Sequence, residues 1–204
     1  VPFENALIPK LTRSMPNLTI IDLRDGLNLL VQKGSQSGEL DPHTWLDPLL
    51  VKHQARTIRD TLIRVDPADS KEYQANFSQF AADLDTLDSR LRNILRPFAG
   101  QTVYVFHPAY GYFCRAYNLT QKAVVENGKK PGARHLARLI EHARNDRVKV
   151  IFVQPQFSKK TAKTIARAIG GTVVALDPLA KDYITNMASM AEQLAAGLQG
   201  TVQK

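Results

Sequence analysis

Apolar runs and amphipathic segments alternate in the second half of the chain. Short runs rich in β-branched residues predict buried parallel strands at 102–106, 120–125, 148–153 and 172–176. Apolar residues at helical spacing predict helices between and after these runs, at 109–117, 132–145, 158–169 and 181–199. Strands that alternate with helices build a parallel sheet covered on both faces. The pattern therefore predicts a complete doubly wound α/β lobe over residues 98–204.

The middle of the chain carries a long helical pattern. Apolar residues recur there at alternating steps of four and three, and they are Tyr73, Phe77, Phe80, Leu84, Leu87, Leu91 and Ile94. Asp66 is expected to cap the start of this helix, with Pro67 at its first position and Pro97 at its end, so one linking helix is expected over 66–97. About 30 residues extend roughly 45 Å at 1.5 Å per residue, enough to run along two lobes. A coiled-coil seam has the same spacing, but the pattern lasts only about three heptads between compact α/β units, which favours packing within the chain.

Residues 1–65 combine helical and strand patterns. Apolar positions predict a helix over 1–17 and a short strand over 18–21. A further helix is expected from Pro48, because Asp47 can accept hydrogen bonds from free backbone N–H groups and Pro tolerates the first helical position. A helix that feeds a strand is the end of a crossover unit, so residues 1–65 are expected to form part of an incomplete amino-terminal α/β lobe.

Composition and charge are those of a globular protein. The 204 residues are 44% hydrophobic and 23% charged, and no apolar run approaches the ~20 residues that span a bilayer. A net charge of +8 could indicate a nucleic-acid or anionic-surface partner, but the basic residues are dispersed along the sequence. Their densest cluster, from Lys129-Lys130 to Arg138, lies around a turn and a helix start and is interpreted as solvated surface. No nucleic-acid partner is expected.

Three potential metal ligands stand at places where α/β folds bind ligands. His43 lies just ahead of the helix that begins at Pro48, and the positive end of that helix favours a neutral imidazole. His107 and Asp177 each follow a buried strand and precede a Pro, at the edge where open parallel sheets bind ligands. Taken one at a time, His43 could be a neighbour of a helix cap, His107 a packed core residue and Asp177 a helix cap.

Five ordered motifs resemble one protein family. They are residues 41–48 (Asp-Pro-His-Thr-Trp-Leu-Asp-Pro), 106–113 (Phe-His-Pro-Ala-Tyr-Gly-Tyr-Phe), 128–132 (Gly-Lys-Lys-Pro-Gly), 153–158 (Val-Gln-Pro-Gln-Phe-Ser) and 176–179 (Leu-Asp-Pro-Leu). Their order and spacing are similar to those of the metal-binding solute-binding proteins of bacterial zinc and manganese ABC transporters, the ZnuA, TroA and PsaA group. The resemblance runs nearly from end to end. It implies two α/β lobes joined by a long helix, with a transition metal held between them.

The resemblance also implies a role and a place. It implies capture of a metal ion in the periplasm or elsewhere outside the cytoplasm, with a lipid-anchored lipoprotein as one form of the full-length protein. The metal would be delivered to the permease of an ABC transporter in the membrane. Zinc is expected, with manganese as the alternative, because His107 stands where manganese-type relatives carry Glu. In these relatives a further His ligand comes earlier, so the chain is expected to lack its first ligand and part of its first lobe.

With this resemblance, His43, His107 and Asp177 are expected to bind the metal together. Two imidazole nitrogens and one carboxylate oxygen are donors that zinc prefers. Gln154, where relatives often carry Glu, is expected to contribute indirectly at most. Four further residues are expected to shape the pocket or orient the ligands, and they are Asp41, Trp45, Tyr110 and Tyr112.

A zinc hydrolase is the main alternative from another class. Two His and one carboxylate with a vacant position are also the ligand set of catalytic zinc sites. The sequence has no His-Glu-x-x-His motif, and its candidate ligands come from separate segments, so metal binding without catalysis is favoured and no enzyme is expected. A surface adhesin, a role suggested for some relatives, is a second alternative that no residue pattern favours. His53 lies near an apolar helical stripe and is interpreted as a packed or surface residue.

Overall fold

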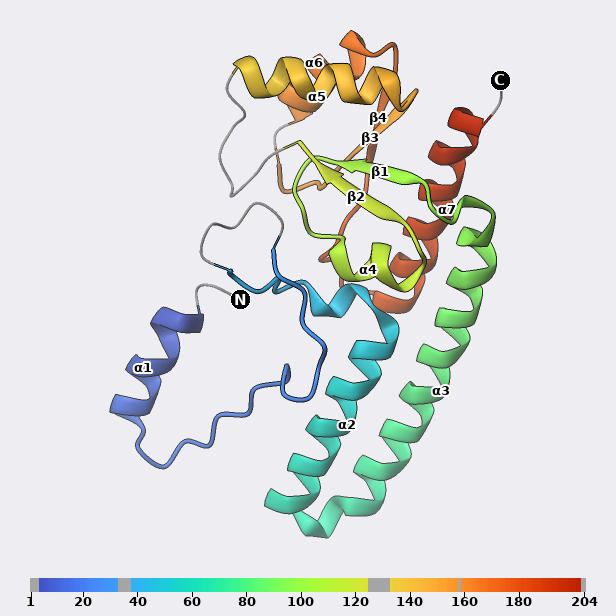
Figure 1. The fold of residues 1–204 in the computed structure, drawn as a ribbon. Helices are drawn as coiled ribbons and strands as arrows, with labels where there is room; N and C mark the ends of the chain where they lie inside the picture. The colour runs from blue at the N-terminus through green and yellow to red at the C-terminus, as the bar shows by residue number, and fades with distance from the viewer. Residues whose placement is uncertain (1–3, 33–37, 125–132, 158, 203–204) are drawn as a thin grey trace.

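The second half of the chain forms a sheet of four parallel strands, as the alternating pattern predicts (Figure 1). The structure is a computed structural model that describes residues 4–32, 38–124, 133–157 and 159–202. The strands are β1 (Thr102–Val105), β2 (Thr120–Ala123), β3 (Val150–Val153) and β4 (Thr172–Ala175). Their order across the sheet is β2-β1-β3-β4.

Helices account for most of the remaining described chain. They are α1 (Glu4–Ser14), α2 (Pro48–Val65), α3 (Ser70–Leu95), α4 (Gly111–Ala116), α5 (Ala133–Asn145), α6 (Lys159–Ala168) and α7 (Tyr183–Val202). Short 3₁₀ turns at Thr44–Leu46, Pro67–Asp69 and Arg96–Phe98 flank α2 and α3. Among the described residues, none of these helices combines the length and apolar character needed to cross a bilayer.

Helices cover both faces of the sheet, so two separate apolar cores form. One core lies between the sheet and α3, α4 and α7, and it contains Val103 and Val105 of β1. The other lies under α5 and α6, and it contains Tyr104 of the same strand. Successive side chains of a strand point to opposite faces, which is why the residue between two valines enters the other core. The described residues therefore contain a four-stranded parallel sheet with helices on both faces, and the bounds 98–204 of the lobe stay a prediction.

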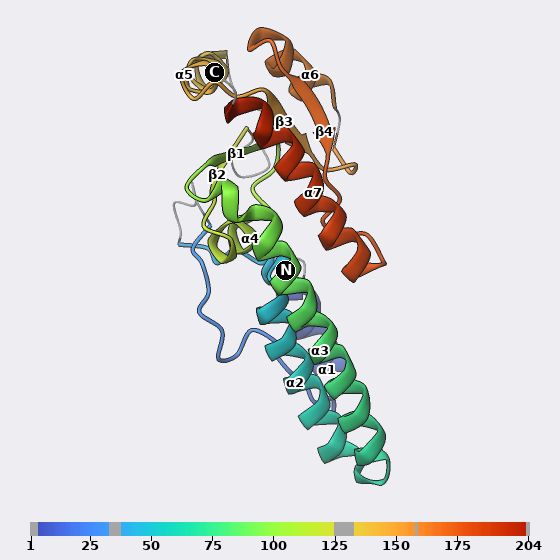
Figure 2. The same ribbon diagram turned by 90° about the vertical axis from the view of Figure 1, so that its right-hand side faces the viewer.

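The predicted long helix is α3, and it packs within the chain rather than as a seam for another chain (Figure 2). Its 26 residues extend about 39 Å at 1.5 Å per residue. The buried residues of α3 lie between Ala81 and Leu95, where the helix packs on α7 and joins the first core. Its amino-terminal half pairs with α2 in a helical hairpin that projects away from the sheet (Figure 1).

The two Asp-Pro pairs that predict helix starts behave differently. Asp47 accepts a hydrogen bond from the backbone N–H of Leu49 at 2.9 Å, and α2 begins at the next residue, as predicted. Asp66 makes no such cap, and a 3₁₀ turn follows it before α3 begins. Its carboxylate accepts a hydrogen bond from the hydroxyl of Tyr73 at 2.8 Å instead. The expectation that Asp66 caps the long helix is wrong, because Tyr73 occupies its side chain.

The segment before α2 contains no strand among its described residues. The strand expected at 18–21 is irregular chain, so that prediction is wrong. Leu18, Ile20 and Ile21 are 39%, 42% and 36% exposed, so this apolar run is not in a core. A strand needs a neighbouring strand to bond its backbone groups, and the described chain places none beside this run.

Candidate metal centre

His43 lies immediately before the 3₁₀ turn that leads into α2. Its Nδ1 is 2.6 Å from Oδ1 of Asp41, and its backbone N–H donates to the same oxygen at 2.9 Å. A carboxylate only accepts hydrogen bonds, so Nδ1 carries a proton, and Nε2 is the ring nitrogen left to bind a metal ion. Asp41 therefore orients His43 as a carboxylate typically orients a metal-binding imidazole.

Asp41 is itself held in place by the first residues of α4. Its side chain is buried, and its backbone carbonyl accepts a hydrogen bond from the hydroxyl of Tyr112 at 2.9 Å. The same hydroxyl accepts a hydrogen bond from the N–H of Leu30 at 3.0 Å. A Cβ added to Gly111 would lie 2.6 Å from Oδ2 of Asp41, which is closer than two such atoms approach. The absence of a side chain at Gly111 is therefore what lets the carboxylate lie here.

His107 follows β1, and its ring lies beside His43. The two ring centroids are 5.5 Å apart, and the His107 ring stacks on Phe157 at 5.1 Å. Nδ1 of His107 is buried and has no hydrogen-bond partner in the described part of the chain. Burial, and then the neighbouring His43, lower the pKa of His107 below 6.5, so the ring is neutral at pH 7. A buried ring nitrogen without a partner costs free energy, and a metal ion bound to its lone pair would remove that cost.

Gln154 fixes the backbone around His107 from the end of β3. Its Nε2 donates to the carbonyl of His107 at 2.9 Å, and its Oε1 accepts from the N–H of His107 at 3.3 Å. A Glu carboxylate could make the second bond but could not donate the first. The side chain is almost completely buried and bonds to backbone, which agrees with the indirect role expected from the sequence.

Asp177 follows β4, and its carboxylate is already bonded. Oδ1 accepts hydrogen bonds from Nε2 of Gln156 at 2.8 Å and from the N–H of Leu179 at 3.0 Å. The hydroxyl of Tyr110 donates to the carbonyl of Leu176 at 2.9 Å and so holds the end of β4. Among the described residues, no three His, Cys, Asp or Glu side chains form a group that could hold a metal ion. The structure thus brings two of the three expected ligands together, and the place of Asp177 in the ligand set stays a prediction.

Two hydrogen bonds connect the His43 segment to the Asp177 loop. Nε1 of Trp45 donates to the carbonyl of Pro178 at 2.9 Å, and the hydroxyl of Tyr183 donates to the carbonyl of Trp45 at 2.8 Å. We call this pair of bonds the Trp45 link. The partners of the first bond are 133 positions apart in the sequence, and those of the second are 138 positions apart. The link therefore fixes the spacing between the two segments.

Several supporting residues were missed by the sequence analysis. Gly111 lies inside the 106–113 motif, and Gln156 and Phe157 lie inside the 153–158 motif. Their place in these motifs could have identified them as supporting residues. Tyr183 lies in none of the motifs, and its hydrogen-bond partner, Trp45, is in a distant segment, so the sequence did not indicate its role. The 128–132 motif and Lys129-Lys130 lie outside the described residues.

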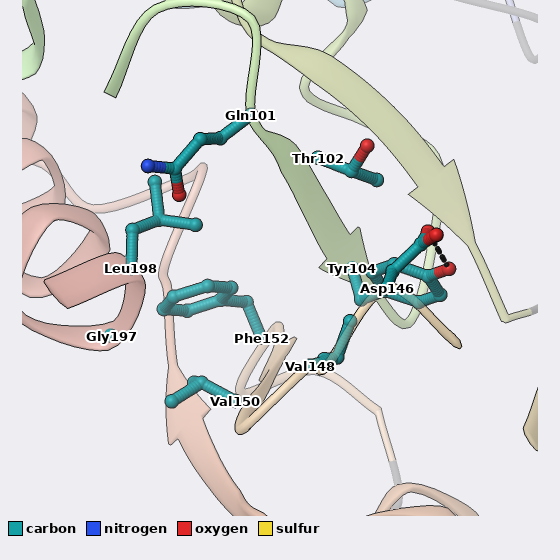
Figure 3. A pocket seen from close by; sticks show the side chains of 9 residues that line it. All are labelled: Gln101, Thr102, Tyr104, Asp146, Val148, Val150, Phe152, Gly197 and Leu198. Carbon is teal, nitrogen blue, oxygen red and sulfur yellow. Dashed lines mark hydrogen bonds between the residues drawn. The ribbon is translucent and has the colours of Figure 1, made fainter. Parts of the chain in front are cut away.

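A separate cavity of about 290 Å³ lies at the opposite, amino-terminal edge of the sheet (Figure 3). It forms because β1 and β3 pair only at Val105 and Phe152 and separate toward their starts. Asp146 is the one carboxylate among the residues that line it, and it already accepts hydrogen bonds from Tyr104 at 2.6 Å and Lys122 at 2.7 Å. The lining therefore does not offer a metal-ligand set.

A parallel α/β sheet with two neighbouring imidazoles beside its carboxyl edge indicates a metal-binding protein of the solute-binding class. The chain belongs to the ZnuA family, described as zinc-uptake complex component A of the periplasm, and the family model matches residues 1–197. Members of this family are binding proteins for transport and not enzymes. Family membership therefore confirms the resemblance found in the five motifs and argues against the hydrolase alternative.

Three relatives show the extent of the similarity. The high-affinity zinc uptake system protein ZnuA of Bacillus subtilis is 30% identical over 145 residues, which are 70% of this chain and 46% of that protein. The chain thus spans about half the length of the curated relatives that it matches. A crystal structure of ZnuA is 37% identical with a TM-score of 0.89, over 96% of this chain and 75% of that one. A zinc-bound ZnuA deletion mutant is 38% identical with a TM-score of 0.88, over the same shares.

Proposed function

We propose that this chain is the metal-capturing part of a zinc-uptake solute-binding protein. His43, His107 and Asp177 bind Zn²⁺ as cargo, and no reaction is catalysed. The observation that carries the proposal is the pair of imidazoles 5.5 Å apart, one oriented by Asp41 and the other with a buried nitrogen that lacks a partner in the described chain. Two such nitrogens are the donors that zinc most commonly takes from proteins.

Asp177 completes the proposed ligand set. Its Oδ1 already accepts two hydrogen bonds, which orient the carboxylate and leave Oδ2 for the ion. The Trp45 link keeps the loop of Asp177 beside the segment of His43. Nitrogen donors at both His43 and His107 favour zinc over manganese, which prefers oxygen.

The longer protein would use this site for import. Two α/β lobes joined by α3 would enclose the ion in the periplasm, with a lipid-anchored form as a variant, and would deliver it to the permease of an ABC transporter. The family description and the zinc-uptake relatives support this assignment.

Calorimetric titration with zinc tests the site directly. We expect saturable binding by the wild-type chain and at least about tenfold weaker binding by His43→Ala and His107→Ala, because each removes one donor. Asp177→Ala should weaken binding in the same way. His53→Ala is the matched control, since His53 bonds the carbonyl of Asp25 and lies outside the proposed ligand set. Wild-type affinity in both His43→Ala and His107→Ala would show that the ion binds elsewhere.

A further inference from the structure

Nearly all of the net positive charge lies in one segment of the chain. Residues 133–168 contain nine Lys and Arg against two Asp and Glu, a net charge of +7, whereas the whole chain carries +8. This segment consists of α5, β3 and α6. About a third of the basic residues lie here, but few acidic residues accompany them, so this segment carries most of the net charge.

The two helices lie on the same face of the sheet, so their outer sides form one surface (Figure 1). Leu139 and Ala143 of α5 and Ala162 and Ile165 of α6 are buried in a common core against the strands. The opposite side of each helix is exposed and carries basic residues, with Glu141 as the acidic residue of this side of α5. Four of its residues, which we call the basic layer, are Arg134, Arg138, Lys163 and Arg167. Within each helix the two cations are four residues, or about 6 Å, apart along the axis.

The cations of the basic layer are not neutralised within the described chain. None of the four has an ion-pair partner there, and the first turns of α5 and α6 contain no acidic residue. Some cations on other helices are paired. Lys52 pairs with Asp85 at 2.6 Å and Arg92 with Asp88 at 2.7 Å. An anionic partner would relieve the repulsion between the like charges of this layer.

We propose that the basic layer docks the protein on the surface of anionic phospholipid membranes. Clustered Lys and Arg side chains are attracted to anionic headgroups, with a contribution from each charge near the surface. The four cations are spread over two neighbouring helices instead of converging on one point, which fits an array of headgroups. This inference adds a membrane contact to the proposed function, but it depends on charge alone and not on zinc.

A nucleic acid is the other polyanion to consider, and the layer lacks what single strands need. Between residues 133 and 168 the aromatic residues are Phe152 and Phe157. The first is buried in the core and the second stacks on His107, so neither is available to stack on a base. The apolar sides of α5 and α6 are also used in the core, so membrane contact would be peripheral, without insertion, and weakened by salt.

Co-sedimentation of the zinc-free chain with vesicles tests the proposal. We expect binding to phosphatidylcholine vesicles that contain phosphatidylglycerol, no binding to phosphatidylcholine alone, and loss of binding as salt rises. Replacement of all four residues of the basic layer by Gln should weaken binding at least about tenfold. A control variant removes the same number of exposed charges elsewhere, with Gln at Lys10, Arg13, Arg56 and Lys71, and should keep binding within about threefold of wild type.

A charge-preserving variant guards against a folding defect. Replacing Arg134, Arg138 and Arg167 by Lys should retain vesicle binding, because attraction to a lipid surface depends on charge and not on the bidentate geometry of Arg. Equal losses in the layer and control variants would show that only net charge matters and would overturn the proposal. Tighter binding to duplex DNA than to the vesicles at the same salt would identify a nucleic-acid surface instead, and would also overturn it.

Discussion

At the scale of single residues, the two imidazoles of the candidate site are supported in different ways. Nδ1 of His43 has a carboxylate acceptor in Asp41, and Gly111 leaves the space that this carboxylate occupies. His107 is fixed through its backbone by Gln154, but its own buried Nδ1 has no partner in the described residues. The His43 ring is therefore oriented before a metal ion binds, whereas the buried nitrogen of His107 gains a partner only when the ion binds.

Gly111→Ala should damage the site through Asp41. The added methyl group would lie 2.6 Å from Oδ2 of Asp41, so the carboxylate must move away from Nδ1 of His43. We expect zinc affinity to fall about tenfold, because outer-shell partners of metal ligands typically have effects of this size. The free energy of unfolding should fall by about 1–3 kcal/mol from overpacking. Calorimetry with zinc and chemical denaturation measure the two effects.

A double-mutant cycle shows whether Gly111 acts through this contact. In an Asp41→Ala background the carboxylate is absent, so Gly111→Ala should cause little further loss of zinc affinity. Equal losses in both backgrounds would mean that Gly111 does not act through Asp41.

At the scale of elements, the same dipeptide produces two different helix starts. Asp47 accepts the N–H of Leu49 and caps α2, whereas Asp66 accepts the hydroxyl of Tyr73 and precedes a 3₁₀ turn. The local sequence is compatible with either outcome, because an Asp before Pro can cap a helix or bond a nearby side chain. The position of Tyr73 on the following helix decides between them.

Asp47→Ala should destabilise the protein by about 1 kcal/mol, the usual cost of losing a helix cap. Burial raises the pKa of Asp47, so its charge is not what stabilises the fold, and Asp47→Asn should cost little. Asp69→Ala is a suitable control, because Asp69 precedes α3 without a side-chain cap bond. Urea denaturation at pH 7 gives the three values, and equal losses at Asp47 and Asp69 would contradict the capping role.

The end of α5 is joined to the sheet by a pH-sensitive contact. Hydrogen bonds first from Lys122 and then from Tyr104 lower the pKa of Asp146 below 3.8, so the ionised carboxylate stabilises the folded state. Asp146→Asn should reduce the free energy of unfolding at pH 7 by about 1 kcal/mol or less, since solvent screens this partly exposed pair. A lowered pKa gives stability that is present above the unfolded pKa and is lost as the pH falls through the folded pKa. The difference between wild type and variant should therefore shrink below about pH 4. A difference in urea denaturation that stays constant down to about pH 3 would count against this contact.

The sequence predicted the elements best in the second half of the chain, where apolar runs and helical patterns alternate regularly. The strands and helices after Gly100 follow the predicted order because each apolar run has a partner strand that is also in the chain. The run at 18–21 has the same character but no strand beside it in the described residues, and its side chains are exposed. Local pattern states which segments can become strands, and pairing decides which of them do.

At the scale of the whole molecule, long-range contacts assemble what the sequence presents as separate motifs. The motif segments were identified from the sequence, but their relative positions depend on bonds such as those of the Trp45 link, whose partners are 133 and 138 positions apart in the sequence. The excess of basic residues over 133–168 is visible in the sequence, but the cations of the basic layer form one surface only because α5 and α6 cover the same face of the sheet. In both cases the sequence shows the residues but not how they are arranged in space.

The Trp45 link also has an optical consequence. Trp45 is the only tryptophan of the chain, and its indole ring lies in edge contact with His43 at a centroid distance of 5.2 Å. A divalent ion on His43 would place positive charge beside the indole, which shifts the energy of its excited state. Tryptophan emission should therefore change saturably during a zinc titration, remain unchanged in His43→Ala, and respond normally in His53→Ala. The protein would then act as its own fluorescent indicator, and the arrival and release of zinc could be timed in a stopped-flow instrument without any added dye.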